Sequence, residues 1–255
     1  MTVSRSGVGP SGPWSDSLAV LRAWDPRWAA AIEAMTNSPW TSGVLPRKFV
    51  ELVSLAVSVA CTNLDKQATR RHIRAALDEG ASRDEIVAVF KMATVMAIHA
   101  CSLGAPILVD EAKTAGAPIE QPAVATPFAD KMRAAGQWNV AWDPFVALDP
   151  AWTDAAMAAG LGIYGGGVFS AKEIELLSIA FDASYTHMYA PGVRRHVKGA
   201  LVAGASPIEI MEVLKICVAQ GAEACNLGVA ILQEELADRD ARSSPGATHD
   251  DRSPR

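Results

Sequence analysis

The chain has 255 residues, of which half are hydrophobic and few are aromatic, and it carries a formal net charge of −5. This acidic balance excludes the basic surface field that binds nucleic acid or an anionic membrane. The polar N-terminus lacks the apolar core of a signal peptide, and the four cysteines have neither C-x-x-C spacing nor the density of a disulfide scaffold. We therefore expect a reduced cytoplasmic protein.

An internal duplication organises the chain. The stretch RRHIRAALDEGAS at 70–82 recurs as RRHVKGALVAGAS at 194–206, and a shift of 124 residues aligns the two halves without a gap. About a third of the aligned positions are identical, which identifies a repeat. From this alignment and the local composition we predict five segments, namely a disordered N-terminus 1–16, a first repeat 17–111, a linker 112–140, a second repeat 141–237 and a disordered tail 238–255.

Helical periodicity is present throughout the first repeat. It predicts helices over about 17–36, 46–63, 66–79 and 83–103. The first of these has its apolar residues at helical spacing, at Leu18, Leu21, Trp24, Trp28 and Ile32. Ser82, followed three residues later by Glu85, forms a capping-box pattern that marks the start of the fourth helix. The apolar run 92–109 contains His99, Gly104 and Pro106, so we interpret it as a buried helix and not as a membrane span.

The second repeat follows an ordered linker with one short helix near 128–135, and it has predicted helices at 144–159, 171–186, 191–203 and 207–237. Ser206 and Glu209 repeat the capping box. The glycine-rich run 160–168 predicts a loop, either a plain connection or, with Tyr164, a mobile lip over a site. It is not a phosphate loop, because no Lys-Ser/Thr pair follows the glycines. No segment alternates with a period of two, so the predicted fold is all-α, built from two copies of one helical unit.

One histidine in each copy lies on the apolar face of the third helix of its repeat. These are His72 and His196, and each follows two arginines. A core histidine satisfied by a hydrogen bond would give the same pattern. Glu51 and Glu175 occupy matched positions 21 residues earlier, and an antiparallel hairpin would bring each glutamate to its histidine. Such a pair can share a proton and act in general acid–base catalysis, whereas a solvated glutamate stabilised by the helix dipole would have no such role.

Metal binding is not predicted from the spacing. His187 and His196 are nine residues apart and Glu175 precedes His187 by twelve, which matches no recognised short ligand motif. His99 aligns with Glu223, so the last helix of each repeat offers one titratable group that either lines a pocket or is buried and bonded.

Two sequence blocks that occur in both copies resemble a known family. In both copies E-L-x-S-(L/I)-A precedes R-R-H-(I/V)-(R/K)-x-A-L-x2-G-A-S-x2-E-I and a long apolar helix, as in the carboxymuconolactone decarboxylase family, also called the alkylhydroperoxidase D-like fold. The resemblance implies an all-α chain of two tandem units of this kind that assembles as a homotrimer.

The redox branch of this family carries C-x-x-C before the histidine. The matching positions here are Asp65 and Ala68 in the first copy and Tyr189 and Gly192 in the second, so no thiol is available there. A dithiol peroxidase cycle requires a reactive thiolate, and we reject that activity.

The decarboxylase branch keeps the histidine without the dithiol. The resemblance therefore implies a cofactor-free carboxy-lyase of aromatic catabolism, acting on a small anionic lactone such as 4-carboxymuconolactone. His72 with Glu51, or His196 with Glu175, would be the acid–base pair. The residues expected to bind the substrate are Arg70 and Arg71 in the first copy and Arg194, Arg195, Tyr185, His187 and Tyr189 in the second.

We expect the second copy to be the catalytic one, because its turn contains Tyr185, His187 and Tyr189 where the turn of the first contains Cys61, Asn63 and Asp65. Two other functions stay open. An enzyme of the same fold can catalyse another proton transfer on a small metabolite, such as isomerisation, hydration or ring opening in aromatic catabolism or secondary metabolism. Alternatively, the chain is a non-catalytic binding or assembly module in which the histidines only pack. Fold analogy does not separate these.

Overall fold

The computed structural model describes residues 12–120 and 123–243, and these residues form helices and connecting turns with no strand among them. The predicted all-α class is confirmed. The chain divides into two compact units, one formed by residues 38–220 and one by the two ends of the chain. The units do not follow the repeat boundaries, and each is described separately below.

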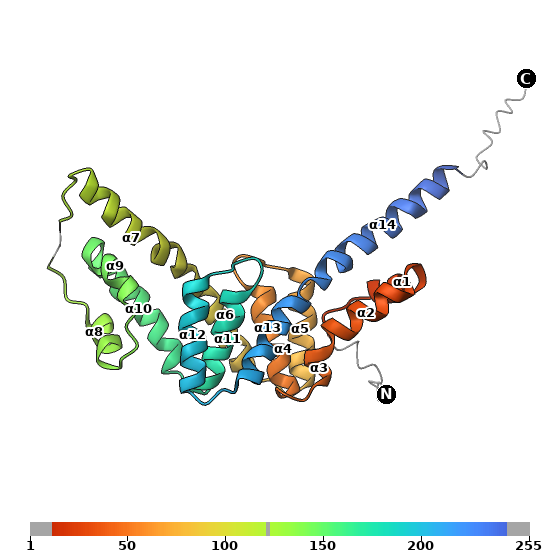
Figure 1. Cartoon of the computed structure of the whole chain (residues 1–255), viewed down its shortest axis with the longest axis horizontal. Helices are drawn as coiled ribbons and strands as arrows, with labels where there is room; N and C mark the ends of the chain where they lie inside the picture. The colour runs from red at the N-terminus through yellow and green to blue at the C-terminus, as the bar shows by residue number, and fades with distance from the viewer. Residues whose placement is uncertain (1–11, 121–122, 244–255) are drawn as a thin grey trace, which may run out of the picture. The chain divides into compact units, whose positions relative to one another are not determined.

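The larger unit contains two matched sets of three helices, labelled in Figure 1. The first set is α4 (Arg47–Val59), α5 (Lys66–Asp78) and α6 (Arg83–Val95), and the second is α11 (Ala171–Ala183), α12 (Ala190–Val202) and α13 (Pro207–Ala219). Each helix of the second set begins and ends 124 residues after its partner. The structure therefore preserves the duplication in its helix bounds.

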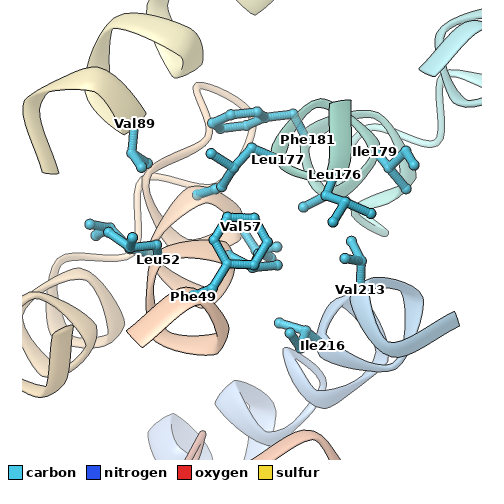
Figure 2. Close-up of a cluster of buried hydrophobic side chains, with 14 of the residues drawn as sticks. Phe49, Leu52, Val57, Val89, Leu176, Leu177, Ile179, Phe181, Val213 and Ile216 are labelled. Carbon is cyan, nitrogen blue, oxygen red and sulfur yellow. The ribbon is translucent and has the colours of Figure 1, made fainter. Parts of the chain in front are cut away.

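The central helices α4 and α11 supply the core of this unit. All residues of α4 from Phe49 to Ser58 are buried, as expected for a helix enclosed on every side. Figure 2 shows side chains of α4 and α11 facing one another, among them Leu52 and Leu177, with α6 and α13 contributing Val89 and Val213 around them. Burial of one Leu, Ile or Phe side chain contributes about 1.5–3 kcal/mol. This core fixes the position of both histidine helices.

The turn between the first two helices of each set is built in the same way. Leu64 and Met188, at matched positions, both have a φ of 51°, which is unusual for residues other than glycine. After this turn Asp65 caps α5 by accepting from the backbone N–H groups of Gln67 and Ala68. Tyr189 takes the equivalent place before α12 and makes no side-chain cap. The second repeat thus lacks this N-cap hydrogen bond, which typically stabilises a helix by about 1 kcal/mol, and has the Tyr189 phenol at that position.

The predicted capping boxes are confirmed at Ser82 with Glu85 and at Ser206 with Glu209. The helices that they begin are shorter than predicted. The helix expected over 83–103 ends at Val95 and is followed by a 3₁₀ turn, η1 (Met96–Ile98), and by α7 (His99–Thr114). The helix expected over 207–237 likewise ends at Ala219.

A second cluster in the larger unit surrounds the linker. It brings α7 together with α8 (Pro127–Ala134), η2 (Val140–Trp142), α9 (Asp143–Leu148) and α10 (Pro150–Tyr164), and its buried members are Ala129, Met132, Trp142, Phe145 and Met157. The short helix predicted near 128–135 corresponds to α8. The short α3 (Ser38–Thr41) also belongs to the larger unit.

The glycine-rich run is mostly helical. Helix α10 continues through Gly160 and Gly162 to Tyr164, so only the residues after Tyr164 form the connection, where Gly167 has a φ of +67°. Tyr164 is half-buried against the main core. The prediction of a loop over the whole of 160–168 was wrong, and Tyr164 does not form a lip.

The apolar run 92–109 is only partly buried, which corrects the expectation of a buried helix. Ser102 is the one buried residue of α7, and Leu103, Ile107 and Leu108 are exposed. By length and composition alone, two helical stretches, Arg83–Thr114 and Pro207–Ser243, are long and apolar enough to cross a membrane, which is weak evidence for a span.

The smaller unit consists of α1 (Ser17–Trp24), α2 (Pro26–Thr36) and α14 (Ala222–Ser243). The single helix predicted over 17–36 is broken at Asp25, whose side chain accepts from the Trp28 N–H while Pro26 begins α2. Trp24 and Trp28 are 46% and 43% exposed, so they do not belong to the buried stripe.

Order in the smaller unit extends beyond the predicted boundaries. Trp14, placed in the segment expected to be disordered, is buried and donates from Nε1 to Thr36 Oγ1 at 2.8 Å. Helix α14 continues past 238 to Ser243. Residues 1–11 and 244–255, including His249, lie outside the described residues.

Candidate active site

Both predicted histidine–glutamate pairs form in the structure. His72 Nδ1 lies 2.8 Å from Glu51 Oε2, and His196 Nδ1 lies 2.7 Å from Glu175 Oε2. In each case the antiparallel hairpin brings the start of its first helix beside the middle of its second. The glutamates are therefore partners of the histidines and not solvated helix-start residues.

The pair in the first repeat is enclosed by protein. Glu51 is fully buried, accepts from Trp40 Nε1 at 2.7 Å through its second oxygen, and has Arg47 at 3.6 Å. The Trp40 ring also stacks on His72 with centroids 6.2 Å apart. Both oxygens of Glu51 are thus engaged, as in a satisfied core pair. Arg70 is exposed and Arg71 half-buried.

In the second repeat the same pair is more open. Tyr164 replaces Trp40, and the Glu175 side chain is 21% exposed. The carboxyl lies against helix α12 at Gly199, where an added Cβ would be 2.6 Å from Glu175 Cδ. The first repeat has Ala75 at this position. Replacement of alanine by glycine thus gives Glu175 a place against α12.

Asp182, which was not among the predicted site residues, lies at the centre of the second site. It replaces Ser58 of the first repeat, and it is fully buried. Its Oδ2 is 3.7 Å from His196 Nε2, and neither carboxyl oxygen has a hydrogen-bond partner in the described parts of the chain. Burial raises the pKa of Asp182 to about 8, so the isolated carboxyl holds a proton at neutral pH.

Space for Asp182 comes from a glycine on the facing helix. An added Cβ at Gly192 would lie 2.0 Å from Asp182 Oδ2, and the first repeat has Ala68 at this position. Ser58 and Ala68 have therefore become Asp182 and Gly192 together. This paired exchange is the sequence signal that would have found the site.

Three further side chains surround Asp182. His99, the first residue of α7, has its Nδ1 at 3.4 Å from Asp182 Oδ1 and at 2.8 Å from His187 Nε2. The Tyr189 ring stacks on His99 with centroids 4.1 Å apart. Burial lowers the pKa of His99 to about 3, assisted by the neighbouring His187, and burial also lowers the pKa of His187. Both imidazoles are neutral at pH 7.

A cavity of about 450 Å³ opens beside this cluster. Its wall includes the titratable side chains of His99, Tyr189, Arg195, His196 and Lys198. The remaining lining comes largely from the segment before α9 and includes Trp138, Asn139 and Trp142, which the sequence analysis did not single out. The Arg195 guanidinium lies over the Trp142 ring at 4.9 Å and donates to the Gln137 carbonyl at 3.4 Å.

Not all of the predicted binding residues of the second repeat line this cavity. Arg194 is exposed and lines a separate, largely apolar surface hollow, so Arg195 is the arginine of this pair that faces the cavity. Tyr185 is 55% exposed and does not line the cavity. Tyr189 lines the cavity, whereas His187 contacts His99 and is not part of the cavity wall. Among the described cysteines, Cys217 is buried with a pKa raised by burial to about 12, and Cys61 is exposed.

Comparison with known proteins identifies the family of the chain. The family model described as carboxymuconolactone decarboxylase family matches residues 26–102 and again residues 150–234. The chain belongs to the carboxymuconolactone decarboxylase family.

A solved structure provides a second comparison. It is the crystal structure of a provisionally named gamma-carboxymuconolactone decarboxylase subunit from Burkholderia xenovorans LB400, with 30% sequence identity and a TM-score of 0.81. The match covers 89% of this chain and 92% of that one. No curated protein sequence matches the chain significantly.

The second site therefore combines a carboxylate-linked imidazole, a cation and a stacked phenol around one cavity. A volume of about 450 Å³ is in the range of pockets for small ligands. The arrangement can bind a small anion at Arg195 and exchange a proton with it at His196.

Proposed function

We propose that the second repeat is a carboxy-lyase for a small carboxylated γ-lactone of the 4-carboxymuconolactone type. The observation that carries the proposal is the cavity that brings Arg195 and the Glu175-linked His196 to one ligand-sized space, in a chain of this family. The reaction needs no organic cofactor, because the unsaturated lactone itself accepts the electron pair left by CO₂.

The residues have separate roles in this proposal. Arg195 binds the substrate carboxylate, since a guanidinium pairs with a carboxylate through two parallel hydrogen bonds. When the bond between the ring carbon and the carboxylate carbon breaks, its electron pair moves into the conjugated lactone and CO₂ leaves. His196 then donates a proton to carbon, and Glu175 holds the ring and stabilises its protonated form. Solvent returns the proton to the imidazole.

The test is turnover of 4-carboxymuconolactone at sub-millimolar concentration. We expect release of one CO₂ per lactone consumed and, in D₂O, one deuterium bound to carbon in the product. No turnover at high enzyme concentration would refute this substrate assignment.

A second candidate function is another proton transfer on a small anionic metabolite, such as isomerisation, hydration or ring opening. The cluster of His99, Asp182, His187 and Tyr189 favours it, because decarboxylation alone does not require so many polar groups beside the cavity. Product mass distinguishes the reactions, since an isomer keeps the substrate mass, a hydrated or ring-opened product gains one water, and a decarboxylated product loses CO₂.

A non-catalytic role is supported for the first repeat only. Its histidine and glutamate are enclosed by Trp40 and make the bonds of a packing pair. In the second repeat the cavity beside His196 favours a reacting site over a purely structural one.

We also propose that the chain forms a homo-oligomer, with a trimer as the expected state. The support is an apolar hollow of about 980 Å³ on the surface of α12, with Met188, Leu201 and Val202 in its lining. These side chains are 69%, 47% and 83% exposed, and an apolar patch of this kind commonly marks a protein interface.

A further inference from the structure

Three ligand atoms, one from the first repeat and two from the second, converge beside the cavity. They are His99 Nδ1, His187 Nε2 and an oxygen of Asp182, and all three lie within 4.8 Å of one another. The two imidazole nitrogens are 2.8 Å apart, and His99 Nδ1 is 3.4 Å from Asp182 Oδ1. Ligand atoms around one tetrahedral ion at metal–ligand distances of about 2.0–2.2 Å are roughly 3.3 Å apart. Small side-chain shifts would therefore place all three around an ion.

Asp182 supplies an independent observation. It is 0% exposed, yet neither of its carboxyl oxygens has a hydrogen-bond partner in the described chain. Buried polar atoms are normally bonded, and an exception in a native protein requires an explanation such as a bound ion. An ion held by Asp182 together with the two imidazoles would satisfy this carboxylate.

The charged side chains that act on Asp182 are Arg195 and Glu175, which have opposite signs, so the surrounding charge does not by itself favour or oppose a cation. His196, whose Nε2 lies 3.7 Å from Asp182 Oδ2, would be an outer neighbour that orients the carboxylate.

We propose that His99, Asp182 and His187 form a binding site for one divalent transition-metal ion. Two imidazole nitrogens and one carboxylate oxygen suit zinc, iron(II), cobalt or nickel and not the all-oxygen sites of magnesium or calcium. His99 is also part of the cavity wall, so the ion would lie beside the cavity, where water or a substrate anion can complete its coordination.

The site has no counterpart beside the histidine–glutamate pair of the first repeat. The aligned positions of the first repeat and of the last helix hold Ser58, Asn63 and Glu223, which include no imidazole. Short-motif spacing did not predict it, because His99 lies in the first repeat, 83 residues before Asp182. The inference does not depend on the proposed function, since metal binding is measurable without substrate.

The test uses the full-length protein, stripped with a chelator and free of any affinity tag. Zn²⁺ is titrated in competition with a chromophoric chelator, and Co²⁺ binding is followed by its visible absorption. We expect one equivalent of metal per chain with a micromolar or tighter Kd. Asp182→Ser and His187→Asn, which install the aligned residues of the first repeat, should each weaken binding at least about 100-fold and abolish the Co²⁺ absorption.

Two control variants identify binding elsewhere. His72→Gln removes the first-repeat histidine that aligns with His196, and Cys61→Ser removes an exposed thiol. Both should keep the wild-type Kd within about threefold. His99→Gln gives a third ligand variant if circular dichroism shows that Asp182→Ser fails to fold.

Wild-type binding of less than one equivalent, or an unchanged Kd in folded ligand variants, would overturn the proposal. Decarboxylation by the stripped protein would leave the proposed function intact even then. The two ideas therefore fail separately.

Discussion

At the scale of single residues, the two repeats differ by a few exchanges that turn an enclosed pair into an open site. Tyr164 in place of Trp40 leaves Glu175 without an indole donor, and Gly199 gives that carboxyl room against α12. Gly192 in place of Ala68 does the same for Asp182. Each glycine makes room for the acidic side chain that it faces, so the exchange to glycine and the position of that side chain depend on one another.

The dependence between Gly192 and Asp182 is measurable. Gly192→Ala should destabilise the protein by about 1–3 kcal/mol, because the new methyl group overlaps the Asp182 carboxyl. In an Asp182→Ser background, which restores the serine–alanine pair of the first repeat, the same change should cost less. Part of the cost should remain, since Tyr189 Cδ1 also lies 2.7 Å from the added Cβ. Urea denaturation of the four proteins gives the coupling energy, and an equal cost in both backgrounds would refute this packing explanation.

Arg195 and its neighbour Arg194 provide a matched test of substrate binding. Arg195 faces the cavity, whereas Arg194 lies on the separate apolar hollow. Arg195→Met should lower kcat/KM for 4-carboxymuconolactone about 100-fold, the loss expected when a hydrogen-bonded charge pair worth about 3 kcal/mol is removed. Steady-state kinetics should show Arg194→Met within about threefold of wild type. Similar losses in both variants would contradict the assignment of Arg195 as the carboxylate-binding residue.

At the scale of helices, each of the capping boxes at Ser82 and Ser206 connects the third helix of its set to the first. Glu209 accepts from the Ser206 backbone at the start of α13 and pairs with Lys172 of α11 at 2.8 Å. The Lys172 hydrogen bond, with the Ser206 backbone bond, lowers the pKa of Glu209. A lowered folded-state pKa contributes stability above the unfolded value, and this contribution is lost as pH falls through the folded pKa.

Glu209→Gln should therefore destabilise the protein near neutral pH and have a diminishing effect in acid. We expect a loss of about 1 kcal/mol or less at pH 7, since the pair is partly exposed to solvent. The difference in free energy of unfolding between wild type and variant should shrink as the pH falls below 4.5, the ordinary glutamate value. Denaturant titrations at a series of pH values measure it, and a difference that grows toward acid would contradict the explanation.

The sequence predicts those features of the helices that repeat or that depend on local periodicity. The bounds of α5 and the pairing of His196 with Glu175 followed from periodicity and the 124-residue alignment, because both are local or repeated patterns. The break at Asp25 and the helical conformation of Gly160 depend on capping and packing that an apolar stripe does not report. Asp182 escaped notice because one acidic residue in an apolar helix has no spacing signal, and its partner His99 comes from another repeat.

At the scale of the whole molecule, the duplication explains why one chain holds one enclosed and one open version of the same pair. Both repeats contribute to one hydrophobic core. The first repeat keeps an enclosed histidine–glutamate pair, whereas the second has the same pair beside additional polar groups. The exposed apolar side chains of α12 are the surface on which we propose the oligomer contact.

The oligomer proposal gives a direct prediction. Val202 is 83% exposed and lines the apolar hollow, so Val202→Glu would place a charge in the proposed interface. We expect the wild-type chain to elute as a trimer and the variant to dissociate toward monomer with an unchanged helical circular dichroism spectrum. Light scattering coupled to size-exclusion chromatography measures both masses. A wild-type mass of one chain would contradict the proposal.

The comparison of the two matched histidines tests the central claim most directly. His196→Gln should lower kcat for 4-carboxymuconolactone by about 10²–10⁴-fold, as expected for loss of a general acid. His72→Gln, whose amide can still donate to Glu51, should keep kcat within about threefold. A loss in His72→Gln as large as that in His196→Gln, or full activity in His196→Gln, would contradict the assignment of catalysis to the second repeat.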